Sequence, residues 1–230
     1  VYDQFGISEL FYGVKGTTNN GAISISASII YNSWKESTSY KLCEIIKKVL
    51  HQSGAECEIL DLREFDLSPC IGCGKCFESK RCYKDQDFNI IYNKLIKSDC
   101  IFFVSPHYSP IPAKLSMLLE KMGEITFLHW MKDNAYKSQM YNKPAGIISH
   151  GGGSDWALSS YKAMVNDTIA NALDTIQCKI VPYNAEWNTG ISLPVQSVIE
   201  KKDIFPIQTY EWEAVEQKIQ EYVNCVAQAI

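Results

Sequence analysis

Four cysteines crowded into one short segment are the clearest candidates for chemistry in this sequence. They follow the pattern C-x2-C-x2-C-x5-C and are Cys70, Cys73, Cys76 and Cys82. Three thiolates spaced three residues apart can wrap one compact cubane, and a fourth soon afterwards completes its coordination. Gly72 and Gly74 give the backbone the freedom to curl tightly around such a group. The segment therefore predicts a [4Fe–4S] cluster held by these four thiolates.

Two other metal sites compete with this interpretation. Structural zinc sites usually place two C-x2-C pairs far apart, whereas here three cysteines fall within seven residues. In a bacterial ferredoxin run the fourth cysteine is followed by proline and serves another cluster. Here Pro69 precedes the motif instead. Both alternatives fit the spacing less well than a single cluster does.

The other cysteines and the composition describe an ordinary intracellular chain. Five of the nine cysteines stand singly in apolar stretches, where a free cysteine is most often a small core residue: Cys43, Cys57, Cys100, Cys178 and Cys225. A secreted disulfide scaffold would be shorter than 230 residues and would not need a hydrophobic fraction of 46%. Clustered thiols in such a chain point to metal or redox chemistry.

Charge and hydropathy exclude two classes of partner. The formal net charge is −4 and the chain has no block of lysine and arginine, so we expect no nucleic-acid partner. No apolar run approaches the ~20 residues needed to span a bilayer, so we expect no membrane insertion. Residues 1–20 lack a basic stretch followed by an apolar one. We therefore expect a cytoplasmic protein.

The elements that must position the cysteines alternate between strands and helices. Strands are expected at Ala22–Ile25, Glu56–Leu62, Cys100–Val104, Ala145–Ile148 and Lys179–Tyr183. Helices are expected at Tyr40–Leu50, Phe88–Ile96, Ala113–Met122 and Trp156–Ile176, with a closing helix whose apolar face runs from Val215 to Val226. Strands that alternate with helices indicate parallel pairing through right-handed crossovers. The sequence therefore predicts a three-layer α/β sandwich.

Three segments do not fit this alternation. Residues 1–20 are interpreted as an N-terminal extension, and residues 21–230 as a single domain. Within that domain, the segments near 123–142 and 184–208 are interpreted as insertions, the first rich in aromatics and lysine and the second in proline and asparagine. Long irregular segments of this kind are surface excursions, lids or dimer contacts over an active site.

Ligands of an open parallel sheet bind at the carboxyl ends of its strands, so the loops there are candidate sites. The loop after the first strand is rich in hydroxyl groups just before a helix. Its candidate phosphate-binding residues are Ser26, Ser28, Ser37, Thr38 and Ser39. Hydroxyl donors and free backbone N–H groups at a helix N-terminus favour an anion. One such hydroxyl would be explained equally well as an ordinary N-cap.

The loops after the third and fourth strands are suited to a planar ligand. The first of them offers a tyrosine ring and rigid backbone amides, and its candidate residues are Ser105, Pro106, His107, Tyr108 and Ser109. The second allows a close backbone approach to a ligand, and its candidate residues are His150, Gly151, Gly152 and Gly153. Each loop alone has a plain structural explanation, as a β–α turn or a flexible glycine run.

Together the three loops resemble the flavodoxin-like NADPH-dependent FMN reductases over roughly residues 21–183. Ser26–Ser28 and Ser37–Ser39 occupy the places of the family's Ser-Gly-Ser-Pro-Arg and Gly-Asn-Thr. Its second motif is matched by Ser105–Tyr108, followed by Lys114-Leu115 and Glu120-Lys121. The family's proline and arginine are replaced by Ile29 and Ile30, which removes a cation from near the phosphate. The resemblance implies a five-stranded parallel sheet in the order 2-1-3-4-5 and FMN at its carboxyl edge.

The complete four-cysteine pattern resembles the iron–sulfur flavoproteins of this family. That resemblance implies a flavin-dependent oxidoreductase that passes electrons through FMN and a [4Fe–4S] cluster. It also implies a homodimer or homotetramer, with ferredoxin, a quinone or NAD(P)H as donor or acceptor. No acid–base dyad or nucleophile is evident, so no catalytic side chain is predicted.

Three alternatives stay open at this point. Many flavodoxin-like reductases have three cysteines at this place as ordinary loop thiols, and here Cys82 is the addition that favours a cluster. The chain could accordingly be a cluster-free NAD(P)H-dependent FMN or quinone reductase. It could also be a non-catalytic redox sensor that binds flavin or metal.

Overall fold

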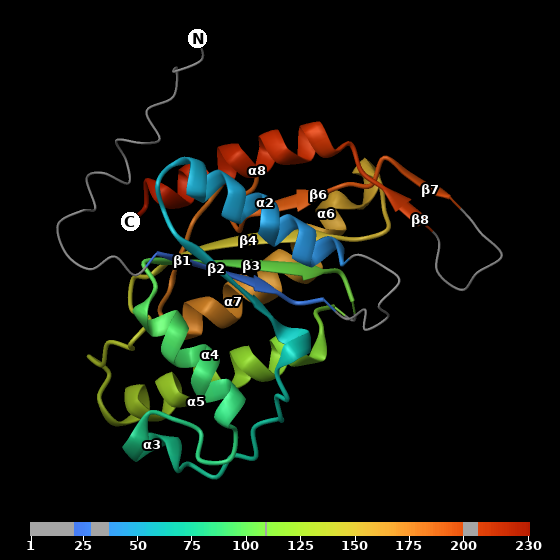
Figure 1. The fold of residues 1–230 in the computed structure, drawn as a ribbon. Coiled ribbons are helices and arrows are strands. Elements are labelled where there is room, and N and C mark those ends of the chain that lie inside the picture. Colours follow the sequence, from blue (N-terminus) through green and yellow to red (C-terminus); the bar gives the residue numbers. More distant parts are fainter. Residues whose placement is uncertain (1–20, 29–36, 109, 200–206) are drawn as a thin grey trace.

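A computed structural model of the chain describes residues 21–28, 37–108, 110–199 and 207–230. Its centre is a parallel sheet with helices on both faces (Figure 1). The sheet has the order β2-β1-β3-β4-β5, in which the strands are β1 (Ala22–Ser26), β2 (Cys57–Asp61), β3 (Cys100–Pro106), β4 (Pro144–His150) and β5 (Lys179–Ile180). The predicted fold class and strand order are therefore confirmed.

The edge of the sheet beyond β4 is split between two short strands. β5 pairs only with Pro144–Ala145 at the start of β4, and it stops before Pro182, which has no N–H to donate. The strand predicted through Tyr183 is thus shorter than expected. The end of β4, Ile148–His150, pairs instead with β6 (Ile191–Leu193), a sixth strand that the sequence did not predict.

Helices α2 (Thr38–Gln52) and α8 (Trp212–Ala227) cover one face of the sheet, above it in Figure 1. Their apolar faces form one core with the sheet, in which Leu42, Ile46 and Ile219 are fully buried. Tyr222 of α8 also bridges the split edge of the sheet: its hydroxyl accepts from the Ile147 N–H (3.1 Å) and donates to the Val181 carbonyl (2.8 Å).

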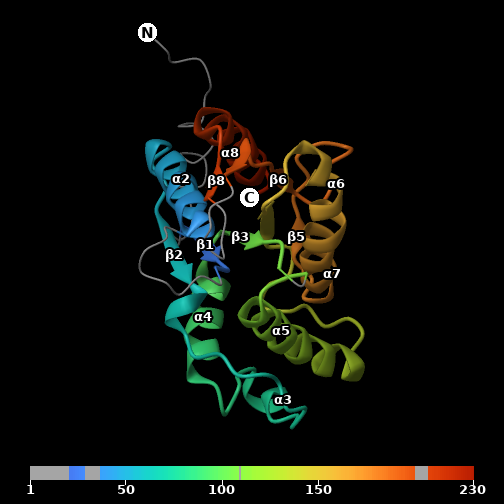
Figure 2. The same ribbon diagram turned by 90° about the vertical axis from the view of Figure 1, so that its right-hand side faces the viewer.

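The opposite face is covered by α4 (Gln86–Lys97), α5 (Ala113–Lys132) and α7 (Asp167–Thr175), which share a second core (Figures 1 and 2). α5 was predicted to end at Met122, but it continues through Gly123 to Lys132 because its apolar face is buried on both sides of the glycine, at Leu118 and Ile125. It therefore includes the first part of the segment near 123–142. The predicted division of the chain into an extension, a domain and insertions stays a prediction.

The long helix predicted over Trp156–Ile176 is instead a series of short segments. A 3-10 turn η2 (Asp155–Ala157) leads into α6 (Leu158–Tyr161), a π-helical segment η3 (Lys162–Asn166) and then α7. Asn166 is fully buried and its Nδ2 donates to the Ile191 carbonyl (3.2 Å), which joins η3 to β6.

Four smaller elements complete the described structure: η1 (Leu62–Glu64), α3 (Cys76–Ser79), and β7 (Ser197–Ile199) paired antiparallel with β8 (Ile207–Thr209). Of these, α3 lies within the cysteine segment. A search of the described residues for a helix both long and apolar enough to cross a bilayer finds none.

Candidate functional site

The strands that carry the three candidate flavin loops end next to one another. β3 lies between β1 and β4, and Pro106 at its end is in register with His150 of β4. The loops that follow Ser26, Pro106 and His150 therefore leave the same edge of the sheet, as the sequence analysis expects of a ligand site. Residues 29–36 and the candidate Ser109 lie outside the described residues.

The first loop presents buried hydroxyl groups at the start of α2. Ser37 is the N-cap of α2: its Oγ accepts from the Tyr40 N–H (3.2 Å), which leaves its own O–H to donate. Ser26 is fully buried, and its Oγ has no hydrogen-bond partner among the described residues. A buried hydroxyl without a partner is uncommon, and a bound phosphate would supply one. Ser28 is buried beside it and Thr38 opens α2.

His150 connects all three loops. It is 5% exposed, its Nε2 lies 2.8 Å from the Ser39 Oγ at the start of α2, where the first loop ends, and its carbonyl accepts from the His107 N–H of the second loop (2.7 Å). Burial lowers the pKa of the imidazole to about 4, so the ring is neutral at physiological pH. Its Nδ1 is buried without a hydrogen-bond partner in the described part of the chain.

The glycines of the third loop pack against a tyrosine that the sequence did not single out. A Cβ at Gly151 would lie 2.6 Å from the Tyr161 ring, and one at Gly153 would lie 2.3 Å from the Ala157 Cβ and 2.8 Å from the Tyr161 hydroxyl. The Gly153 N–H donates to that hydroxyl (2.5 Å). Packing of Tyr161 at Gly151, and of Ala157 and Tyr161 at Gly153, therefore explains why these two positions are glycine, while Gly152 between them is exposed.

The second loop carries the exposed aromatic groups. Tyr108 is 56% exposed, which leaves its ring free to cover a planar ligand. His107 packs against the Tyr161 ring, with 5.3 Å between centroids, and its Nε2 lies 3.1 Å from the Met164 Sδ of the π-helical segment. Ser105 is buried and its Oγ donates to the Pro106 carbonyl (3.1 Å), so it stiffens the loop.

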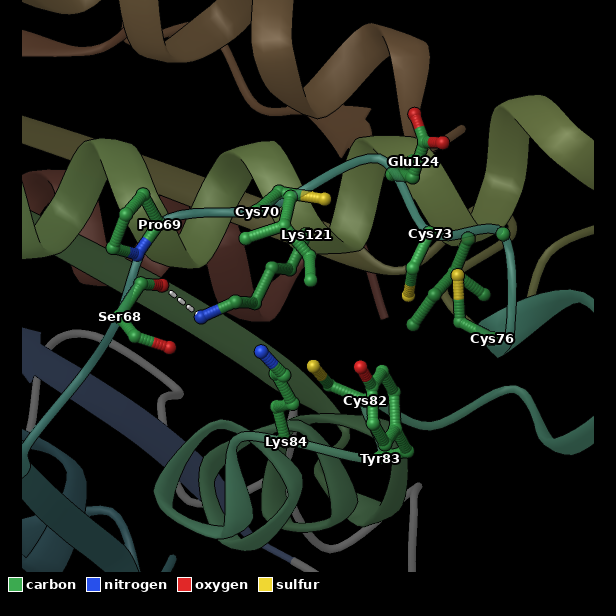
Figure 3. A pocket seen from close by; sticks show the side chains of 13 residues that line it. Ser68, Pro69, Cys70, Cys73, Cys76, Cys82, Tyr83, Lys84, Lys121 and Glu124 are labelled. Atoms are coloured by element: carbon green, nitrogen blue, oxygen red, sulfur yellow. Dashed lines mark hydrogen bonds between the residues drawn. The ribbon is translucent and has the colours of Figure 1, made fainter.

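The four predicted metal ligands line one cavity on the α4–α5 side of the molecule. The cavity has a volume of about 170 Å³. Figure 3 shows Cys70, Cys73, Cys76 and Cys82 around this space. Lys84, Lys121 and Glu124 line it as well. Within the described residues, no three His, Cys, Asp or Glu side chains form a ready site for a single metal ion.

The chemistry of the cavity fits a group held by thiolates. All four predicted ligands are sulfur, and the Gly72 N–H donates to the Cys70 Sγ (3.5 Å). Gly72 and Gly74 have positive φ values of 62° and 68°, so the segment curls as the sequence predicted. Burial raises the pKa of the Cys76 thiol to about 11, so a bound cation would have to displace its proton.

The sequence of residues 25–185, which includes both the sheet-edge loops and the cysteine segment, matches the family model described as NADPH-dependent FMN reductase. The chain belongs to the NADPH-dependent FMN reductase family. The resemblance stated from the three loops is thereby confirmed, and with it the prediction of an FMN-binding oxidoreductase family.

Two curated relatives of this family member are iron–sulfur flavoproteins. One, from Methanocaldococcus jannaschii, is 34% identical over 101 residues, which are 44% of this chain and 48% of that protein. The other, from Methanosarcina thermophila, is 29% identical over 106 residues, 46% of this chain and 51% of that protein. The chain thus spans about half the length of the curated relatives it matches.

Solved structures show the same fold at low sequence identity. RosB with a bound 8-demethyl-8-formylriboflavin-5'-phosphate intermediate superposes with a TM-score of 0.60 at 16% identity, over 90% of this chain and 77% of that one. The flavoenzyme FerB, an NAD(P)H:(acceptor) oxidoreductase from Paracoccus denitrificans, has a TM-score of 0.52 at 14% identity, over 90% of this chain and 97% of that one. At these identities the similarity establishes the fold of this chain and nothing about its activity.

The structure brings the predicted residues of this FMN reductase family member together in two groups. The described flavin candidates lie at one edge of the sheet, and the four cysteines lie around one cavity. Sequence reasoning missed two residues that shape these places, Tyr161 and Asn89, and it noted Lys121 only as part of the family's second motif. Tyr161 and Asn89 stand in helical stretches with no distinguishing signal, whereas Lys121 was visible as a lysine within an otherwise apolar helix face.

Proposed function

We propose that the chain is an FMN-dependent electron-transfer oxidoreductase of the iron–sulfur flavoprotein type. The observation that carries the proposal is the cavity lined by four thiols in a chain that belongs to the FMN reductase family. The names of the curated relatives support it. When bound, FMN accepts two electrons together and a [4Fe–4S] cluster moves one at a time, so the pair converts between the two modes.

The sheet edge would hold FMN through groups that the structure leaves available. The hydroxyls of Ser26 and Ser37 and the N-terminus of α2 would bind the phosphate. Tyr108, which is 56% exposed, would cover the flavin ring. His150 would hold the loops in register, because its hydrogen bonds reach Ser39 on one side and His107 on the other.

The cysteine cavity would hold the cluster through the four thiolates. Cys73 is exposed, so one ligand of the cluster would lie at the surface, where an external donor or acceptor can approach. In this function the donor or acceptor is ferredoxin, a quinone or NAD(P)H, and the protein is a homodimer or homotetramer in the cytoplasm. The side chains of this chain bind and orient the two groups, and none is required to transfer a proton.

The deciding experiment is an anaerobic purification followed by assays of iron, sulfide and flavin per chain. We expect one FMN and about four irons, because a cubane contains four. Cys82→Ser should abolish the iron and leave the flavin, whereas the matched control Cys225→Ser, half-buried in α8 away from the cavity, should leave both unchanged.

Every other result of these assays would indicate a different function or refute the proposal. Flavin without iron would remove the cluster and make the chain a cluster-free NAD(P)H-dependent FMN or quinone reductase. Reversible reduction of flavin and cluster without turnover of any donor–acceptor pair would instead indicate a redox sensor. A chain that binds neither group would refute the proposed function.

A further inference from the structure

The fourth cysteine is held by a side chain that lies outside the cysteine motif. Asn89, in the first turns of α4, is 8% exposed. Its Oδ1 accepts from the Cys82 N–H (2.9 Å) and its Nδ2 donates to the Cys82 carbonyl (2.7 Å). A two-point hydrogen bond of this kind fixes both the position and the orientation of the residue it holds. Cys82 is the ligand farthest in sequence from the other three, so its place is the one least determined by the motif itself.

The two ends of the cysteine segment are also joined to each other through a buried ion pair. Lys121 of α5 donates its Nζ to the carboxylate of Asp85 and to the carbonyl of Ser68 (Figure 3), and the two charged side chains are 4% and 1% exposed. Ser68 precedes the first cysteine and Asp85 follows the last. Asp85 in turn accepts from the Ser68 N–H (3.0 Å) and caps α4 through the Phe88 N–H (2.8 Å).

A third contact fixes the first cysteine from the same helix. The Cys70 N–H donates to the Glu120 Oε2 at 3.0 Å, one residue before Lys121 in α5. Both α4 and α5 pack in the core on this side of the sheet, and Leu95 and Leu118 of these helices are fully buried there. The cysteine segment is therefore attached at its start and its end to two helices that the fold has already placed.

We infer that Asn89 and the Asp85–Lys121 pair are positioning residues that hold the cysteine segment in its ligating arrangement before any cluster is bound. The inference rests on the proposed function, because it assigns these residues to the [4Fe–4S] site. It deepens that function by placing the support of the site outside the motif, in α4 and α5. Partners of metal-binding groups that lie beyond the ligands are generally worth roughly 10–100-fold in metal affinity.

Asn89→Leu is the variant that tests this support most directly. Leucine has the same branched side-chain shape, although it is larger, and a better helix propensity, so α4 should persist while both hydrogen bonds to Cys82 are lost. Asn93→Leu is the matched control: it is one turn farther along α4, is half-buried and makes no described hydrogen bond to the cysteine segment. Should Asn89→Leu fail to fold, the double variant Asp85→Asn with Lys121→Met removes both buried charges together, so neither is left unpaired.

Three measurements separate positioning from general stability. The first is the rate at which a chelator removes iron from anaerobically purified protein, which we expect to rise at least roughly tenfold in Asn89→Leu. The second is the alkylation rate of Cys82 in the iron-free chain, which should rise in the same variant because the residue is no longer tethered. The third is the absorption spectrum of the cluster, which should change while flavin content and the midpoint of thermal unfolding stay near those of Asn93→Leu.

The outcomes distinguish this inference from the proposed function. Iron in the wild-type chain, with equal release and alkylation rates in Asn89→Leu and Asn93→Leu, would overturn the inference and leave the function standing. A wild-type chain without iron would overturn the function and, with it, the role assigned to Asn89. Faster release together with faster alkylation of Cys82 would support both.

Discussion

Acid should destabilise the fold through His150, the residue that joins the three loops at the sheet edge. Its side chain is buried, and burial lowers its pKa from the ordinary value of 6.5 to about 4. In the unfolded chain the imidazole takes up a proton below about pH 6.5, while in the folded chain it stays neutral down to about pH 4. Protons therefore favour the unfolded state in this window, and stability falls as the pH falls through it.

The size of the effect follows from the two pKa values. Each unit of pKa difference corresponds to about 1.4 kcal/mol, so lowering the pH from 7 to 4.5 should cost His150 about 2.5 kcal/mol of unfolding free energy. This is a large share of the roughly 5–15 kcal/mol that holds a typical domain together. Carboxylates titrate in the same range, so the contribution of His150 has to be measured as a difference.

The assay is urea unfolding of the wild type and His150→Gln at pH 7, 6, 5 and 4.5. Glutamine can replace the hydrogen bond of Nε2 to Ser39, but it does not titrate. Between pH 7 and pH 4.5 the unfolding free energy of the wild type should fall by about 2.5 kcal/mol more than that of His150→Gln. His51→Gln, on the exposed end of α2, should follow the wild type. If the difference in unfolding free energy between the wild type and His150→Gln is the same at all four pH values, the reasoning is refuted.

Two further substitutions test the packing that supports the flavin edge. Tyr222→Phe removes the hydroxyl that bridges the Ile147 N–H and the Val181 carbonyl, so these buried backbone groups lose their partner. Urea unfolding should show that the free energy of unfolding falls by about 1–3 kcal/mol. A loss near zero would mean that water replaces the bridge. Gly151→Ala places a methyl group against Tyr161, so the free energy of unfolding should fall by about 1–3 kcal/mol and the flavin content should fall with it. An undiminished flavin content would contradict this account of the loop.

A control for the second substitution is available in α5. A Cβ at Gly123 would meet nothing within 4 Å. Gly123→Ala should therefore stabilise the chain by roughly 0.5–1 kcal/mol, through the helix propensity of alanine, and leave the flavin content unchanged.

The sheet could be predicted from the sequence because its strands are strongly marked. Cys100–Val104 is a continuous apolar run, and a strand buried on both faces has to be apolar throughout. The sixth strand, Ile191–Leu193, has only three residues in a stretch rich in proline and asparagine, too short for any periodicity. Its place is determined by β5, which ends before Pro182 and leaves the end of β4 without a partner.

The sequence predicted that the four cysteines gather in one place, and they line one cavity, but it did not predict the side chains that hold them there. Spacing along the chain marks Cys70 and Cys82 as partners, since the motif is local in sequence. Asn89 and Lys121 reach the segment from two helices, and only the packing of those helices brings the side chains to it. Asn89 gives no pattern that a reader of the sequence could recognise, whereas Lys121 is recognisable as a lysine in an apolar helix face but not as a partner of this segment.

The placement of the two cores on opposite faces of the sheet has a consequence for how this family can change. The helix that begins at the candidate phosphate loop, α2, belongs to one core, and the helices that hold the cysteine segment, α4 and α5, belong to the other. Substitutions that replace the cysteines of this cavity should therefore leave the packing of α2 unchanged. We therefore expect a change at either candidate site to leave the packing of the other intact.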